Sequence, residues 1–327
     1  MRRIYIYTGN HGHGAGITDL VLMLRNGARD CGYDAVVSHQ PVPGEWNILI
    51  ENFSEQLQEQ FIRSKWAPGT RYIFLCTESL TGRFFNDGMV AGHWHYSDAT
   101  YWRKRFDGFC RLLDLTEELW VLAESQIGAY QAAFPGKEVS LLRHGWVSGM
   151  ATVQHRPEAE KDLDFFFSGS LTPHRTAILE ALDKHHRVAF SPQAGADYLR
   201  ADLLARTKVC LSIPLSPDNH VPSVSRMHYH LQNSNFVLQQ KYQQACDLDP
   251  YVLHVPAEDF LEWARASLDI ENRRAVAEGA HARFRSEMPM SRFMAPLLAA
   301  TPGRATGLAS RAGVARGHPL RATSRLG

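Results

Sequence analysis

The sequence predicts an α/β protein made of two tandem, doubly wound domains that face each other across a cleft. Three observations predict this fold class. Short apolar runs of strand length alternate with helical stretches along the chain, which is typical of parallel sheets covered by helices on both faces. The 327 residues are enough for two hydrophobic cores. A polar, non-periodic stretch at 152–161 divides the alternation into two halves.

The predicted first domain covers residues 1–150. Its last unit, Leu119–Trp146, contains a strand, a helix capped by Ser125 and stopped by Pro135, a second strand and an exit turn. Such a unit indicates a right-handed parallel crossover. The apolar runs expected as strands of this domain are 3–8, 33–38, 48–50, 72–76, 119–123 and 139–142.

A linker at 151–161 leads to a second domain at 162–300. Thr172 and Pro173 are expected to cap and begin its first helix. The runs expected as its strands are 163–167, 188–190, 209–213, 236–239 and 251–254. Residues 301–327 contain no acidic and no aromatic residue, a composition that predicts a disordered basic tail.

Composition limits the possible functions. Hydrophobic residues make up 44% and charged residues 21% of the chain, and the formal net charge is +1, which gives no overall case for a nucleic-acid or membrane partner. The five cysteines are odd in number and form no CxxC pair, which favours free thiols in a reducing compartment. No apolar run approaches the ~20 residues of a membrane span. We therefore expect a cytoplasmic protein without a transmembrane segment.

A glycine-rich loop, Gly9–Gly16, follows the first strand. Its glycines do not match the spacing of the dinucleotide fingerprint, and Ser38-His39-Gln40 supplies no acid after the second strand. A nucleotide-dependent oxidoreductase is therefore disfavoured. The loop either permits a sharp turn or faces a ligand, and in the second case Gly12, Gly14 and Gly16 line the site.

Metal sites have weak support. His93 and His95, with Asp87 or Asp98, lie in the long connection at 78–100, which more plausibly shapes a pocket for an acceptor. The D-x-D strings at 162–164 and 247–249 stand in a strand entrance and a loop. We expect these acids to be solvated turn residues and the protein to need no metal.

Several segments together resemble a known superfamily. The stretch "LWVLAES…AY…FPGKEVSLLRHGW" resembles the end of the N-terminal Rossmann-like domain in GT-B glycosyltransferases. Four later segments resemble the donor domain of that superfamily, especially the bacterial spore-maturation-type proteins, in order across 162–298: "DFFFSGSLTPHRTAILEAL", "ADLLARTKVCLSIPLSPDN", "VPSVSRMHYHLQNSNFVLQQ" and "YVLHVPAEDFLEWARASL".

The resemblance implies an enzyme that moves a sugar from a nucleotide-activated donor to an unknown glycan, lipid or protein acceptor, with no cofactor besides the donor. It also implies that the helical end of the chain, 271–298, crosses back onto the first domain. The family has an acidic residue where Ser223 stands here, so a catalytically silent protein that binds a nucleotide sugar or glycan is the alternative.

Two predicted helix starts in the second domain could bind the donor diphosphate, because helix N-termini offer free N–H groups and a favourable dipole. Each start carries an arginine, Arg175 or Arg226, which can contact phosphate oxygens in a bidentate manner; N-caps and surface arginines are the alternative interpretation. The full set of expected donor-binding residues is Ser170, Thr172, Arg175, Asn219, His220, Ser223, Ser225 and Arg226.

An inverting transfer needs a base that takes the proton of the acceptor hydroxyl. His11 and His13 lie in the glycine-rich loop at the expected ligand-binding edge, and His13, between two glycines, is the first choice. Glu78, at the end of the fourth strand, is the alternative. Both histidines could instead be ordinary loop residues.

Overall fold

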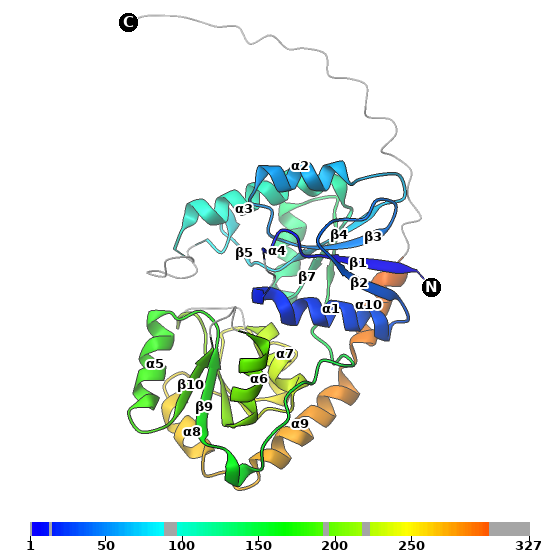
Figure 1. Cartoon of the computed structure of the whole chain (residues 1–327). Coiled ribbons are helices and arrows are strands. Elements are labelled where there is room, and N and C mark those ends of the chain that lie inside the picture. The colour runs from blue at the N-terminus through cyan, green and yellow to red at the C-terminus, as the bar shows by residue number, and fades with distance from the viewer. Residues whose placement is uncertain (1, 13–14, 88–96, 192–195, 218–222, 301–327) are drawn as a thin grey trace, which may run out of the picture.

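A computed structural model of the chain describes residues 2–12, 15–87, 97–191, 196–217 and 223–300 (Figure 1). The expected tail at 301–327 lies outside these residues. The described chain forms two α/β domains, each with a parallel sheet between helices. This arrangement confirms the predicted fold class of two doubly wound, Rossmann-like domains.

The first sheet has six parallel strands in the order β2-β1-β3-β4-β7-β8. Helices α2, α3 and α4 pack on one face, and α1 packs on the other together with α10 from the end of the chain. The strands are β1 (Arg3–Tyr7), β2 (Asp34–Ser38), β3 (Trp46–Ile50), β4 (Arg71–Cys76), β7 (Glu118–Val121) and β8 (Glu138–Leu141), and the helices are α1 (Thr18–Asp30), α2 (Gln56–Ser64), α3 (Ala99–Leu112) and α4 (Ile127–Ala133). A small hairpin of β5 (Leu80–Thr81) and β6 (Phe84–Phe85) follows β4.

The second sheet has five parallel strands in the order β10-β9-β11-β12-β13. Its second strand in this order, β9, is buried on both faces: Phe165 and Phe167 contact the core under α5 and α8, and Phe166 contacts the opposite core. The strands are β9 (Leu163–Ser168), β10 (Val188–Ser191), β11 (Thr207–Ser212), β12 (Val237–Gln240) and β13 (Leu253–Val255), and the helices are α5 (Pro173–Asp183), α6 (Asp197–Ala205), α7 (Val224–Gln232), α8 (Phe260–Ser267), α9 (Arg273–Glu287) and α10 (Met290–Ala299).

The chain crosses between the domains twice, and the two crossings pair with each other. Trp146 N donates to Met288 O at 2.6 Å, and Met290 N donates to Trp146 O at 2.8 Å. Met290 and Met294 then pack in the core with α1, where a Cβ on Gly27 would lie 2.6 Å from Met290 Cγ. The predicted return of the helical end, 271–298, to the first domain is confirmed for α10, whereas α9 packs against α7 of the second domain (Figure 1).

Local predictions had mixed outcomes. Thr172 caps α5 as expected, since its Oγ1 accepts from Arg175 N at 3.3 Å. Ser125 does not cap α4, because a short 3₁₀ turn at Glu124–Gln126 comes first and the helix begins at Ile127 without a side-chain cap. Within the described chain, no helix has both the length and the apolar character that a membrane crossing requires.

Candidate functional site

A pocket of about 200 Å³ lies between the two domains. The first domain contributes the carboxyl ends of β4 and β7 and one face of α4, and the second domain contributes the start of α7. Ligands of α/β proteins bind at this edge of a parallel sheet. The residues that line the pocket are Cys76, Thr77, Glu78, Ser79, Val121, Leu122, Ala123, Gln126, Tyr130, His144, Ser223, Val224 and Ser225.

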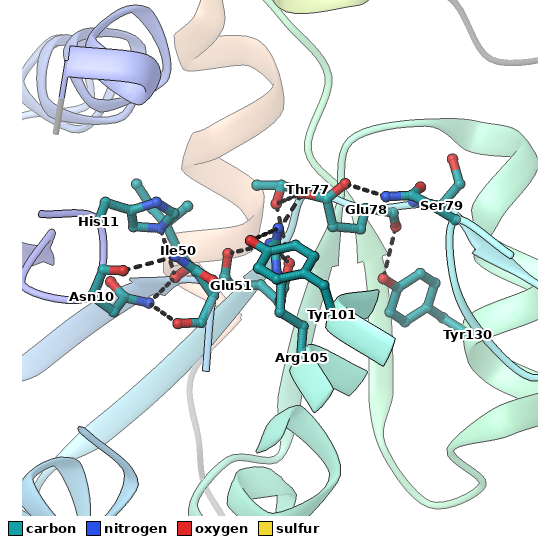
Figure 2. Close-up of polar contacts among 12 residues, drawn as sticks. Asn10, His11, Ile50, Glu51, Thr77, Glu78, Ser79, Tyr101, Arg105 and Tyr130 are labelled. Carbon is teal, nitrogen blue, oxygen red and sulfur yellow. Dashed lines mark hydrogen bonds and ion pairs between the residues drawn. The ribbon is translucent and has the colours of Figure 1, made fainter. Parts of the chain in front are cut away.

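Glu78, one of the two residues expected as the base, lines this pocket and is held on both carboxylate oxygens (Figure 2). Asn86 Nδ2 donates to its Oε2 at 2.7 Å, and Arg105 Nη2 lies 3.0 Å from its Oε1. Asn86 has a φ of 52°, a left-handed conformation that asparagine tolerates better than most residues. Tyr130 OH donates to Glu78 O at 2.9 Å and fixes the backbone of this residue.

Glu51 and Arg105 form a buried ion pair behind Glu78 (Figure 2). Arg105 Nε lies 3.1 Å from Glu51 Oε1 and Nη2 lies 2.5 Å from Oε2, a bidentate contact. Burial raises the pKa of Glu51 to about 7, although Arg105 opposes this shift. No sequence pattern indicated a role for either residue. The position of Glu51 after the third strand was the one signal available.

The loop after β1 contacts the end of β3, next to Glu51. Asn10 Nδ2 donates to Ile50 O at 2.8 Å, and His11 Nε2 lies 3.3 Å from the same oxygen. Burial lowers the pKa of His11 to about 4, so its imidazole is neutral at pH 7. Gly12 has a φ of 56°, and Gly16 lies in a 3₁₀ turn before α1. His13 and Gly14 lie outside the described residues.

The second domain presents the N-terminal turn of α7 to the pocket. Ser223 occupies the N-cap position but makes no side-chain cap hydrogen bond. A hydrogen bond of 3.0 Å joins Ser225 Oγ to His144 Nε2. Burial, with a smaller effect of His228, holds the pKa of His144 well below its ordinary value, so this imidazole is neutral. Its Nδ1 is buried and has no hydrogen-bond partner among the described residues.

Arg226 belongs to the first turn of α7 and lies against the turn after β9. Its guanidinium lies 4.9 Å from the centre of the Phe167 ring, and Nη1 donates to Ile213 O at 3.4 Å. Gly169 makes this approach possible, because a Cβ there would lie 2.5 Å from Arg226 Nη2. A glycine also suits the φ of 129° at this position.

Arg175 has a different environment from the one expected. Only 2% of the residue is exposed, and its guanidinium donates to Ser170 O at 2.7 Å, to Ile213 O at 2.8 Å and to Pro214 O at 3.1 Å. Thr172 Oγ1 donates to Leu215 O at 2.6 Å beside it. Arg175 therefore ties the β9–α5 turn to the end of β11, which differs from the expectation that its guanidinium faces the donor phosphates.

Further polar groups lie at the carboxyl edge of the second sheet. Ser212 and Gln239 are register partners on neighbouring strands, and both are buried. Ser212 Oγ and Gln239 Oε1 have no hydrogen-bond partner among the described residues. A buried polar atom without a partner costs ~1–3 kcal/mol, so these atoms are suited to a polar ligand. Asn219 and His220, which were expected at this edge, lie outside the described residues.

An ion pair connects the domains near this edge. Arg200 on α6 contacts Asp19 at the start of α1 through two hydrogen bonds of 2.8 and 2.7 Å. The Arg200 guanidinium also lies 3.8 Å from the centre of the Tyr229 ring. Burial raises the pKa of Asp19, although Arg200 opposes this shift.

The acids considered as metal ligands have other partners. Asp162 pairs with Arg206 and Asp164 with Lys208 at the start of β9. Asp98 caps α3, and His93 and His95 lie outside the described residues. The described residues contain no cluster of three or more His, Cys, Asp or Glu side chains suited to a metal. Whether activity needs a metal stays a prediction.

No protein family model matches the chain, and no curated protein matches it. Solved structures do align with it. TarM covers 77% of this chain at 9% identity and a TM-score of 0.47, and the chain spans 54% of TarM, about half its length. AviGT4, a glycosyltransferase involved in avilamycin A biosynthesis, covers 91% of this chain, which spans 96% of AviGT4, at 10% identity and a TM-score of 0.48. A UDP-forming trehalose-phosphate synthase from Burkholderia xenovorans covers 78% of this chain, which spans 73% of the synthase, at 10% identity and a TM-score of 0.45.

Proposed function

We propose that the chain is a glycosyltransferase that moves a sugar from a nucleotide-activated donor to an acceptor hydroxyl, without a metal ion or other cofactor. One observation carries the proposal. The pocket between the domains has the carboxylate of Glu78 on the first-domain side and the N-terminal turn of α7 on the second-domain side. A group that can accept a proton therefore faces a site suited to a leaving phosphate.

The second-domain side is suited to the donor diphosphate. Ser223 and Ser225 lie at the start of α7, where free backbone N–H groups and the helix dipole favour an anion. Arg226 supplies a guanidinium on the same turn, with Gly169 leaving room for it. As the bond between the sugar and the phosphate breaks, the leaving nucleoside diphosphate gains negative charge, which these groups stabilise.

The first-domain side is suited to the acceptor. In an inverting transfer the acceptor oxygen attacks the anomeric carbon and its proton passes to a Glu78 oxygen. Arg105 and Asn86 hold this carboxylate in place. His13, the first choice from the sequence, remains a candidate base. His11 is neutral at pH 7, but its Nε2 lies 3.3 Å from Ile50 O, so this nitrogen already has a partner.

The proposal also covers the cellular compartment and the partners of the reaction. The compartment is proposed to be the cytoplasm, because the five cysteines are odd in number and form no CxxC pair, which is typical of a reducing compartment. The partners are a nucleotide sugar and a glycan, lipid or protein acceptor, with no role for nucleic acid. Membership in the spore-maturation-type group is also a proposal, since it rests on the sequence resemblance.

A catalytically silent binding protein is the second candidate, and Ser223 is the observation that favours it. This residue lies at the start of α7, where the resemblance expects an acid, and a serine supplies no carboxylate to the donor. Both candidates bind a nucleotide sugar, but only the enzyme consumes it.

The first experiment measures the thermal stability of the protein with UDP-, GDP-, CMP- and dTDP-sugars. A ligand present at a hundred times its dissociation constant adds ~2.7 kcal/mol to the free energy of unfolding. The stabilising donor is then incubated with the protein, and nucleoside diphosphate release is measured. Binding with release supports the enzyme, binding without release supports the silent protein, and no binding of any donor refutes both.

The second experiment compares His13→Ala with Glu78→Gln at saturating donor. Loss of the general base cuts turnover roughly a hundredfold or more while donor binding survives. We expect this result for Glu78→Gln. Normal turnover in that variant, together with a large loss in His13→Ala, would assign the base to His13.

A further inference from the structure

The buried pair Glu51–Arg105 lies next to the pocket but does not line it. Glu51 is fully buried and Arg105 is 5% exposed, so neither side chain is placed to touch a substrate. Arg105 comes from α3, and Glu51 follows β3. The two residues are 54 positions apart in the chain and meet only because α3 packs across the end of this strand.

One nitrogen of Arg105 connects this pair to the pocket. Nη2 lies 2.5 Å from Glu51 Oε2, 3.1 Å from Glu51 O and 3.0 Å from Glu78 Oε1. Glu51 therefore fixes the guanidinium from behind, and the guanidinium in turn contacts the carboxylate that faces the pocket (Figure 2).

Stability alone is a weak reason for such a pair. Desolvation of two buried charges offsets much of their attraction, and apolar side chains of similar volume are often as stable or more stable. A buried pair that also contacts a pocket carboxylate has an effect that apolar side chains could not supply.

We infer that Arg105 is a positioning residue for Glu78, held in place by Glu51, and that it keeps the Glu78 carboxylate directed at the acceptor hydroxyl. The inference rests on the proposed function. Asn86 secures the second oxygen of Glu78, so the carboxylate is fixed from two sides. Loss of Arg105 therefore frees one side of this carboxylate.

Other titratable groups face this cluster, and three of them are uncharged near neutral pH. They are His11, whose pKa burial lowers to about 4, and Cys76 and Tyr130, whose pKa values burial raises well above their ordinary ranges. Tyr101 also faces Arg105 from α3. The lasting charge next to Glu78 in this cluster is therefore that of the Arg105 guanidinium.

The test uses the double variant Glu51→Gln/Arg105→Met, which removes both buried charges together and so avoids leaving one unpaired. A matched control, Glu59→Gln/Arg111→Met, removes another ion pair that α3 makes outside the pocket. Thermal melting checks the fold of both proteins. Nucleotide-sugar affinity, kcat and the KM for the donor are then measured for the wild type and for each variant.

We expect the double variant to bind the donor as the wild type does but to turn over roughly ten- to hundredfold more slowly. Its KM for the donor should stay unchanged while kcat falls, a split that a purely structural role would not produce. Arg105→Lys, which keeps the charge without the planar fork, should restore part of the turnover. The Arg105→Lys variant also serves as the test if the double variant does not fold.

A folded double variant with wild-type turnover would overturn this inference while leaving the proposed function intact. If the double variant does not fold, wild-type turnover in Arg105→Lys would overturn it. A wild-type protein that consumes no nucleotide sugar would instead overturn the proposed function, and this inference with it.

Discussion

Arg226 and Arg175 each stand at a predicted helix start in the sequence, yet the structure predicts different results for their alanine variants. Arg226→Ala should mainly weaken nucleotide binding, and Arg175→Ala should mainly lower stability. Arg226 Nη1 donates to a backbone carbonyl at 3.4 Å, and its guanidinium contacts the Phe167 ring. Its removal should lower the free energy of unfolding by about 1–2 kcal/mol, less than the removal of Arg175. The loss of a charge-assisted hydrogen bond to phosphate costs ~1.5–3 kcal/mol. Nucleoside diphosphate affinity should therefore fall roughly 10- to 150-fold.

Arg175→Ala should mainly change stability. Its guanidinium serves the carbonyls of Ser170, Ile213 and Pro214. Each buried acceptor left without a donor costs ~1–3 kcal/mol, so the free energy of unfolding should fall by about 3 kcal/mol or more. Urea unfolding gives the stability change, and calorimetric titration with the free nucleoside diphosphate gives the affinity. Unchanged affinity in Arg226→Ala would refute the phosphate role, and a fully stable Arg175→Ala would refute the role in holding the turn.

Four further predictions follow from the geometry. The pKa of Glu51 in the folded protein is raised to about 7. Its contribution to stability is therefore complete at a pH below its pKa in the unfolded chain, and this contribution, about 3 kcal/mol at most, is lost as the pH rises to about 7. Urea unfolding of the wild type should show this decline in the free energy of unfolding, and Glu51→Gln should lack it. Gly169→Ala should cost about 1–3 kcal/mol of stability, since a φ of 129° strains an alanine, and should weaken nucleotide binding, since the new Cβ displaces the Arg226 guanidinium; wild-type values by melting and calorimetry would contradict this. A double-mutant cycle on Asp19 and Arg200 by urea unfolding should give a coupling of roughly 1–2 kcal/mol, and a value near zero would exclude a latch between the domains. Donor turnover should continue in EDTA, and a loss that manganese restores would show that a metal is needed.

The sequence was most informative where the physics is local. Apolar runs bounded by turn residues predicted the strands of both sheets, because a strand buried on two faces needs few polar positions. The Thr172-Pro173 pair predicted a helix start, since a cap and a fixed φ act within a few residues. Ser125 was equally suitable as a cap, but a 3₁₀ turn precedes the helix there and the cap is not formed.

The site depends on contacts that sequence spacing does not encode. Arg175 and Arg226 each follow a Ser/Thr-rich turn. The Arg175 guanidinium donates to the carbonyls of Ile213 and Pro214 at the end of β11 at 2.8 to 3.1 Å, whereas Arg226 donates to Ile213 O at 3.4 Å. Which arginine is enclosed depends on residues 38 positions or more from Arg175 along the chain. The partnership of Glu51 with Arg105 was likewise invisible, because Arg105 occupies an ordinary position in an amphipathic helix and meets the acid only after the sheet forms.

The relative position of the two domains connects these observations. The pocket needs Glu78 from one domain and the start of α7 from the other, so its geometry depends on contacts that hold the domains together. Three such contacts lie on different elements: the paired crossings at Trp146 and Met288, the packing of α10 on α1, and the Asp19–Arg200 pair. The first two are backbone pairing and a buried core, and they hold one side of the interface firmly. The third is an ion pair between α1 and α6, so it is the contact that competition with a charged donor or a change of salt would weaken first.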